Sequence, residues 1–175
     1  MESVCLGLFA PDGGGVRAVR WAGWDHHHVV VKHGRVALVT GSSRGLGAVI
    51  ARRLAHDGFA VAVNGRPGGA RVAAVGRAIR ADGGTAEGFS ADVTDADQVA
   101  GLAAAVTDCL GPVDVLVVNA TGPRPEAPVT AVGRAGHLAQ LEFFVKSPVL
   151  LGRAPLPGMQ ARRYGRIVQV EWLIS

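Results

Sequence analysis

Residues 35–47 read RVALVTGSSRGLG, and this stretch decides the fold. Its apolar run, 36–39, is typical of a strand that is buried on both faces of a parallel sheet. Gly41, Gly45 and Gly47 follow and lead into a helical pattern. Glycines at such a turn allow a tight bend, close approach of a pyrophosphate and close packing of helix on strand. The helix N-terminus adds free N–H groups and a positive dipole end. The order of strand, glycines and helix therefore predicts a dinucleotide site.

Apolar runs alternate with helical patterns along the rest of the chain. Strands are predicted over 36–39, 59–63, 85–91, 113–118 and 165–170. Helices are predicted from the glycine turn to Gly58, over 68–82, from Thr94 to Leu110 and over 137–159. This alternation predicts an α/β fold with a doubly wound, mostly parallel sheet.

Two of these helices carry more detailed predictions. In the first, Leu46, Ile50 and Leu54 recur at helical spacing, so they are expected to form its apolar face. In the third, Thr94 and Asp97 have the spacing of a capping box, so Thr94 is expected to begin that helix.

Composition describes one globular domain. The chain has 175 residues, of which 49% are hydrophobic, and that is enough to fill a sizeable core. Its formal charge of +4 comes from arginines that are scattered apart from Arg162, Arg163 and Arg166, so an anionic cofactor is favoured over nucleic acid. Cys5 and Cys109 lack partners at metal spacing, which indicates a reducing compartment. Because no stretch of 18 apolar residues occurs, no membrane association is expected and the cytoplasm is the default.

The glycine motif, with Thr40 and the spacing Thr-Gly-x-x-x-Gly-x-Gly, resembles that of the short-chain dehydrogenase/reductase family. GRIVQV at 165–170 resembles the family's fifth strand, so the resemblance runs from Arg35 to about Val170. It implies a three-layer Rossmann-type domain and hydride transfer between a nicotinamide dinucleotide and a small carbonyl or alcohol substrate, as in 3-oxoacyl carrier-protein reductases. It also implies a homo-oligomer for the intact parent. The turn residues expected to hold the cofactor are Gly41, Ser42, Ser43, Arg44, Gly45, Leu46 and Gly47.

The end of the second strand indicates which dinucleotide binds. An enzyme for NAD(H) places a carboxylate here to bind the ribose 2′-hydroxyl, whereas this chain has Asn64 followed by Arg66. Arg66 and Arg44 suit a 2′-phosphate, so NADP(H) is expected over NAD(H). The alternative is that Arg66 is a solvated turn residue.

Two later strand ends complete the predicted cofactor site. By resemblance, Asp92 accepts a hydrogen bond from the adenine amino group beside the backbone of Val93; the alternative is that Asp92 only caps the turn. Asn119, Ala120 and Gly122 match the family's Asn-Asn-Ala-Gly, in which Asn braces the central strands and the small residues admit the nicotinamide ribose. Thr121, which precedes Gly122, departs from that pattern.

The family's proton-transfer residues are missing, so no catalytic residue is assigned. Phe144 stands at the place of the relay asparagine and Trp172 at that of the serine. The single tyrosine, Tyr164, is followed four residues later by Val168, so no Tyr-x-x-x-Lys occurs. The chain is therefore expected to be the cofactor-binding half of a reductase whose reading frame ends early, with a fold incomplete at the C-terminal side and no activity by itself. The alternatives are a non-catalytic dinucleotide-binding module and a degenerate product that neither folds nor binds.

The first 33 residues differ in character from the remainder. They hold three consecutive glycines and the run His26-His27-His28, without a helical or strand period. We expect residues 1–33 to be an irregular extension and residues 34–175 to be the domain. Although these histidines and His33 could in principle bind a metal, adjacent ligands rarely converge on one ion, so a solvated loop is favoured and no metal site is assigned.

Overall fold

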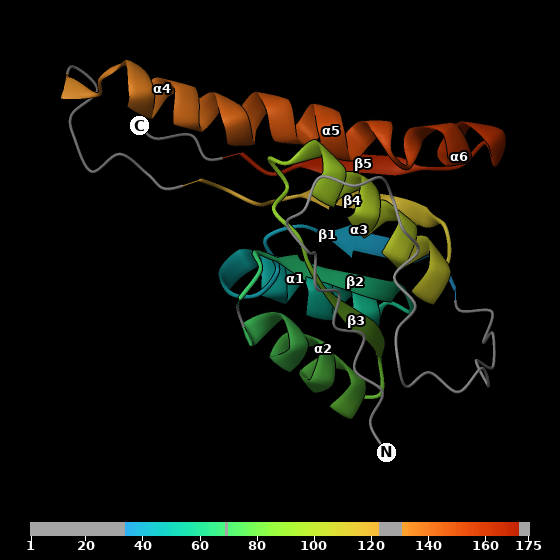
Figure 1. Ribbon diagram of the computed structural model, residues 1–175. Coiled ribbons are helices and arrows are strands. Elements are labelled where there is room, and N and C mark those ends of the chain that lie inside the picture. The colour runs from blue at the N-terminus through green and yellow to red at the C-terminus, as the bar shows by residue number, and fades with distance from the viewer. Residues whose placement is uncertain (1–33, 69, 123–130, 172–175) are drawn as a thin grey trace.

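The computed structural model describes residues 34–68, 70–122 and 131–171. Five parallel strands form one sheet in the order β3-β2-β1-β4-β5. The strands are β1 (Val36–Val39), β2 (Ala60–Gly65), β3 (Thr85–Ser90), β4 (Val113–Val118) and β5 (Arg166–Gln169). The predicted doubly wound α/β fold is therefore confirmed, and Figure 1 shows helices on both faces of the sheet.

Helices connect the strands. They are α1 (Gly45–His56), α2 (Arg71–Ala81), α3 (Ala96–Cys109), α4 (Arg134–Leu141), the π-helix η2 (Glu142–Lys146), α5 (Ser147–Arg153) and α6 (Leu156–Ala161). The predicted single helix over 137–159 is therefore divided, and its last break falls at Ala154 and Pro155, where proline cannot donate a helical hydrogen bond. In Figure 1 these last helices run as one long rod above β4 and β5.

The core consists of two layers because successive strand residues face opposite sides of the sheet. On one side Leu38 and Ala62 pack with α3 and with Leu151 of α5. On the other side Val39 and Val63 pack with α1 and α2. The strands β1 and β2 are buried at every residue, which explains their continuous apolar sequence.

The structure confirms two of the three residues predicted for the apolar face of the first helix. Ile50 and Leu54 are partly buried and pack against the core, whereas Leu46 is 44% exposed. The fully buried residues of α1 are the small ones, Gly47, Ala48, Ala51 and Ala55, and small side chains let the helix lie close to the sheet.

The last strand differs from the others. All four residues of β5 are exposed, including Ile167 and Val168, although β5 pairs along its length with β4. The rod above it also exposes apolar side chains at Leu138, Leu141, Val145, Val149 and Leu156. The interior is therefore complete around β1 and β2 and open around β5.

The expected irregular extension over 1–33, with its histidines, lies entirely outside the described residues. Among the described residues, no cluster of three or more His, Cys, Asp or Glu is placed to hold a metal ion. None of the helices in that part of the chain combines the length and the apolar character that crossing a membrane requires.

Candidate nucleotide-binding site

The carboxyl ends of β1, β2 and β4 meet at the glycine turn. Since β1 lies between β2 and β4, the chain leaves β1 in one direction along the sheet and later returns to its other side. Open α/β sheets bind ligands at such a switch point, outside the carboxyl ends of the strands. The turn of residues 40–47 therefore lies where this architecture forms a site (Figure 1).

Thr40 joins β1 to β4 at this point. Its side chain is fully buried, and its Oγ1 donates to the Val117 carbonyl oxygen at 3.2 Å. Oγ1 of Thr40 also accepts hydrogen bonds from the backbone N–H groups of Asn119 at 3.0 Å and Ala120 at 3.2 Å. One hydroxyl thus fixes the end of β4 against the start of the turn, a role that the sequence analysis did not assign to it.

Asn119 braces the turn from the other side, as the resemblance implied. Its Nδ2 donates to the carbonyl oxygens of Thr40 at 3.0 Å and Gly41 at 3.2 Å. A Cβ at Gly47 would lie 2.5 Å from this Nδ2, and one at Gly41 would lie 2.7 Å from the Cα of Ala120. These two glycines therefore admit the strand-end residues rather than a ligand.

Gly45 serves a different purpose. It has a φ of +55°, and a Cβ added to it would have no neighbour within 4 Å. Arg44, Gly45 and Leu46 are exposed, no side chain caps α1, and its first turn contains no acidic residue. The N–H groups of this turn are therefore open to an anion, which the helix dipole also favours.

Ser42 and Asn64 lie at the site, but their side chains are turned inward. Ser42 Oγ donates to the Val39 carbonyl oxygen at 2.6 Å and accepts from the Asn64 N–H at 3.0 Å. The Asn64 side chain is 1% exposed, and its Nδ2 donates to the carbonyl oxygens of Phe89 and Ala91, both at 3.3 Å. The Asn64 amide therefore bonds on the β3 side, and its side chain is turned away from the place where an NAD(H) enzyme has its ribose-binding carboxylate.

Gly65 is the β2 residue that faces the glycine turn. A Cβ there would lie 2.7 Å from Cγ2 of Val72 and 3.1 Å from Cβ of Ser43. A carboxylate side chain at this position would therefore displace α2 or the turn. Arg66, the next residue, is exposed at the rim. Gly65 was missed in the sequence because the strand extends two residues beyond its predicted end at residue 63.

Asp92 follows β3 and is only partly committed to its own turn. Its Oδ1 accepts from the N–H of Thr94 at 2.9 Å and from its hydroxyl at 2.7 Å. Its Oδ2 accepts no hydrogen bond from the residues that the structure describes. Val93, the neighbour expected to act through its backbone, has a buried side chain. Asp92 therefore makes the turn of the alternative interpretation and keeps one oxygen available.

The predicted capping box is wrong by one residue. The N-cap of α3 is Asp95, whose Oδ1 accepts from the N–H groups of Asp97 and Gln98, both at 3.0 Å. The hydrogen bond from the backbone N–H of Gln98 is the leading cause that lowers the pKa of Asp95 below its ordinary value. Thr94 is instead bonded to Asp92, which explains why it does not cap the helix.

Gly122 and Ala120 border the far side of the site. A Cβ on Gly122 would collide with the Phe143 ring of η2, so glycine allows the segment to pass beneath this helix. Ala120 is partly buried and Thr121 is exposed. The ring of Phe143, which no motif in the sequence indicated, thereby limits where the residues after β4 can lie.

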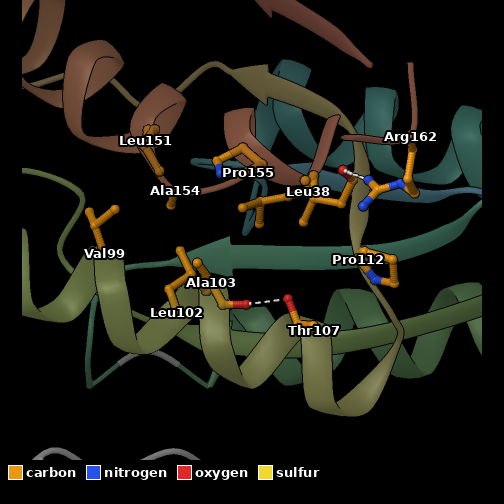
Figure 2. A pocket seen from close by; sticks show the side chains of 12 residues that line it. Leu38, Val99, Leu102, Ala103, Thr107, Pro112, Leu151, Ala154, Pro155 and Arg162 are labelled. Atoms are coloured by element: carbon orange, nitrogen blue, oxygen red, sulfur yellow. Dashed lines mark hydrogen bonds between the residues drawn. The ribbon is translucent and has the colours of Figure 1, made fainter. Parts of the chain in front are cut away.

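A separate cavity of about 200 Å³ lies between α3 and the rod of α5 and α6. Figure 2 shows its mainly apolar lining, with Leu102 of α3 on one side, Leu151 and Pro155 on another, and Leu38 beside Pro155 toward Arg162. None of the predicted cofactor residues lines it. This cavity is therefore distinct from the glycine turn.

Tyr164 lies at the amino ends of the strands, whereas the glycine turn lies at their carboxyl ends. It precedes β5, and the guanidinium carbon of Arg35, the residue before β1, is 4.1 Å from its ring centre. Lys146 pairs with Glu142 in η2 at 2.8 Å. The structure therefore does not bring this tyrosine to the turn.

Comparisons with known proteins agree with this geometry. A family model described as short chain dehydrogenase matches residues 35–173. Cis-4-hydroxycyclohexanecarboxylate dehydrogenase of Sinomonas cyclohexanicum is 38% identical over 141 residues, which are 81% of this chain and 56% of that protein. Acetoacetyl-CoA reductase of Allochromatium vinosum is 34% identical over 78% of this chain and 55% of that protein. The chain spans about half the length of most of the curated relatives it matches.

Solved structures with cofactor bound are also similar. A metagenomic short-chain oxidoreductase in complex with NADP has a TM-score of 0.74 and 38% identity, over 81% of this chain and 64% of that one. A 3-oxoacyl (acyl-carrier-protein) reductase from Agrobacterium tumefaciens with NADP bound has a TM-score of 0.69 and 39% identity, over 78% of this chain and 52% of that one.

Proposed function

The chain belongs to the short-chain dehydrogenase family, and from that premise we propose that it binds NADP(H) through the glycine turn. We further propose that it carries the cofactor-binding half of an oxidoreductase that transfers hydride between NADP(H) and a small carbonyl or alcohol compound. The bound dinucleotide would supply or accept the hydride. The observation that carries the proposal is the uncapped, exposed start of α1 at Gly45.

Each part of the site has a proposed task. The N–H groups of the turn at Ser43 to Leu46 hold the pyrophosphate, and Gly45 leaves room for it. Oδ2 of Asp92 accepts from the adenine amino group, while the backbone beside Val93 borders the base. Thr40 and Asn119 keep the turn in place, and Ala120 and Gly122 border the nicotinamide ribose.

Two arginines and one glycine give the preference for the phosphorylated dinucleotide a physical basis: the arginines supply positive charge, and the glycine occupies a place too crowded for a side chain. Arg44 and Arg66 are both exposed at the rim of the site. A guanidinium binds a phosphate through two charge-assisted hydrogen bonds. Gly65 leaves no room for the carboxylate that would bind a 2′-hydroxyl and repel a 2′-phosphate.

Titration of the purified chain with NADPH and with NADH, followed by nucleotide fluorescence, tests this proposal. We expect NADPH to bind more tightly, and replacement of both Arg44 and Arg66 by alanine to weaken NADPH binding by about tenfold or more while changing NADH binding little. Arg77→Ala is the matched control, because Arg77 is exposed on α2 and lies outside the turn. Equal affinity for both nucleotides in the unaltered chain would contradict the proposed preference.

A non-catalytic dinucleotide-binding module is the second candidate. Two observations favour it. Tyr164 stacks against Arg35 at the amino ends of the strands, away from the glycine turn. Phe144 holds the place of the relay asparagine. Turnover of a panel of ketones with NADPH separates the two candidates. Measurable oxidation of NADPH would support the oxidoreductase, whereas binding without turnover would support the module.

Partners and compartment are proposed on the same basis. Exposed apolar residues of the rod, Leu138, Leu141 and Val145, support self-association of the intact parent, which sedimentation velocity of the chain and of a Leu141→Glu variant would test. Scarcity of cysteine supports a reducing compartment such as the cytoplasm. Neither nucleic acid nor membrane is proposed as a partner of the cofactor site.

A further inference from the structure

Four arginines gather at the amino ends of the strands, on the side of the sheet opposite the glycine turn. Arg35 immediately precedes β1, and Arg162, Arg163 and Arg166 surround the step from α6 into β5. Arg162 reaches the start of β4, where it donates to the Val113 carbonyl oxygen at 2.9 Å (Figure 2). We name Arg35, Arg163 and Arg166, together with Tyr164, the arginine patch.

Three of these arginines have partners within the chain, and Arg166 is one of them, since it donates to the Gly165 carbonyl oxygen at 2.7 Å and lies 5.4 Å from the Tyr164 ring centre. Arg162 forms an ion pair with Asp114 at 3.2 Å, and that carboxylate also accepts from the Val36 N–H at 3.0 Å. Arg35 lies over the Tyr164 ring at 4.1 Å, an arrangement that stabilises both groups. Contacts within the chain therefore account for these three side chains.

Arg163 has no such explanation. It is exposed, and its guanidinium makes no hydrogen bond or ion pair with the described residues. Its φ is +53°, which makes it the one residue other than glycine with positive φ in the described part of the chain. The backbone here closes α6, since the N–H of Tyr164 donates to the Met159 carbonyl oxygen and that of Arg163 to the Gln160 carbonyl oxygen, both at 3.0 Å.

Such a helix end normally places glycine where this chain has Arg163. A side chain in the left-handed region is unfavourable, and strained positions that persist are frequently functional. The chain therefore keeps a strained cation at a position where glycine would stabilise the fold.

Most of these arginines have no carboxylate partner in the part of the chain that the structure describes. Among the described residues, Asp114 is the one carboxylate that forms an ion pair with any of the four, and it pairs with Arg162. Because the patch lies at the amino ends of the strands, it does not serve the dinucleotide site at their carboxyl ends.

We propose that the arginine patch is a docking surface for an acidic polypeptide segment. Exposed guanidinium groups pair with carboxylates in a planar, bidentate manner. Both Arg35 and Arg166 already lie against the Tyr164 ring, at 4.1 and 5.4 Å from its centre, so the ring offers poor access to the stacked bases that nucleic-acid binders use. This surface therefore matches a chain of carboxylates better than a nucleic acid.

Fluorescence anisotropy of labelled poly-L-glutamate, titrated with the full chain at low ionic strength, tests the proposal. We expect binding that weakens as salt is added, because exposed charges are screened. Arg163→Gly should weaken it by about two- to fivefold without lowering the melting temperature, since glycine relieves the strained backbone. The double variant Arg163→Gly, Arg166→Gln should weaken it by about tenfold.

Matched variants make the test specific. Arg163→Lys keeps the charge and should retain binding within about twofold, and Arg77→Gln, with the same loss of charge on α2, should bind as the unaltered chain does. All variants should bind NADPH equally, which confirms that they are folded. The proposal is overturned by absence of binding, by equal losses in the Arg77→Gln and Arg163→Gly variants, or by tighter binding of a single-stranded oligonucleotide at the same salt.

Discussion

Strands β1 and β5 lie on either side of β4, yet only one of them is enclosed. Every residue of β1 is buried, with helices packed on both faces, whereas every residue of β5 is exposed although its backbone pairs with β4. Both strands therefore pair with β4, but β1 is also paired with β2 on its other side, whereas β5 is the edge strand and its side chains are not covered. The nucleotide site therefore lies where side-chain packing is complete, and its turn is held mainly by contacts of β1, β2 and β4.

The largest effect should come from adding one methyl group at the most crowded glycine of the turn. Gly47→Ala places a Cβ 2.5 Å from Asn119 Nδ2 and 2.6 Å from the Gly41 carbonyl oxygen, so the backbone has to move. We expect a loss of about 3 kcal/mol in the free energy of unfolding. Urea denaturation followed by circular dichroism measures it.

Gly45→Ala is the matched control two residues earlier. No atom lies within 4 Å of the added Cβ, so only the positive φ is unfavourable, at a cost of about 1 kcal/mol. NADPH binding should nevertheless fall, because the methyl group stands where the phosphate approaches. Equal destabilisation by the two substitutions would contradict the assignment of Gly47 to packing and Gly45 to the ligand.

A second effect should follow from removing the hydroxyl that joins β1 to β4. Thr40→Val leaves the N–H groups of Asn119 and Ala120, which are partly buried, without their acceptor. We expect a loss of about 2–3 kcal/mol in the free energy of unfolding. Thr107→Val, which removes an exposed hydroxyl bonded to the Ala103 carbonyl oxygen within α3, should change stability by less than about 0.5 kcal/mol.

The smallest effect should come from the same Val→Ala substitution made in β1 and in β5, compared by the loss in the free energy of unfolding. Val39→Ala in β1 removes fully buried methyl groups and should cost about 2 kcal/mol. Val168→Ala in β5 removes methyl groups from a side chain that is 49% exposed, so it should cost less than about 1 kcal/mol. Similar losses at both positions would show that β5 is covered in solution, for example by self-association, and would contradict its exposure in this structure.

Patterns that depend on neighbouring residues could be read from the sequence. The bounds of β1 and β4 were predicted to the residue because continuous apolar runs end there in glycine or a polar residue. The bracing role of Asn119 followed from family resemblance, and the structure supplies the two hydrogen bonds that perform it. The turn of residues 41–47 was also placed correctly between its strand and its helix.

Features that depend on contacts between distant segments could not be read in this way. Both faces of β2 are buried, so its sequence does not reveal that Asn64 turns inward and that Gly65 faces the turn. Thr94 and Asp95 are both good capping residues, and only the bond between Thr94 and Asp92 decides that Asp95 caps α3. Similarly, small residues form the buried face of α1 because that helix lies close to the sheet, a distance that helical periodicity does not contain.

Hydrogen–deuterium exchange of the full chain with and without NADPH tests whether the glycine turn binds the dinucleotide. We expect slower exchange for amides of residues 41–47 and of the segment around Asp92 when the nucleotide is added. Exchange in β5 and in the rod of α4 to α6 should stay unchanged. If no peptide covering residues 41–47 becomes protected at saturating NADPH, the glycine turn is not a dinucleotide site and the account is wrong.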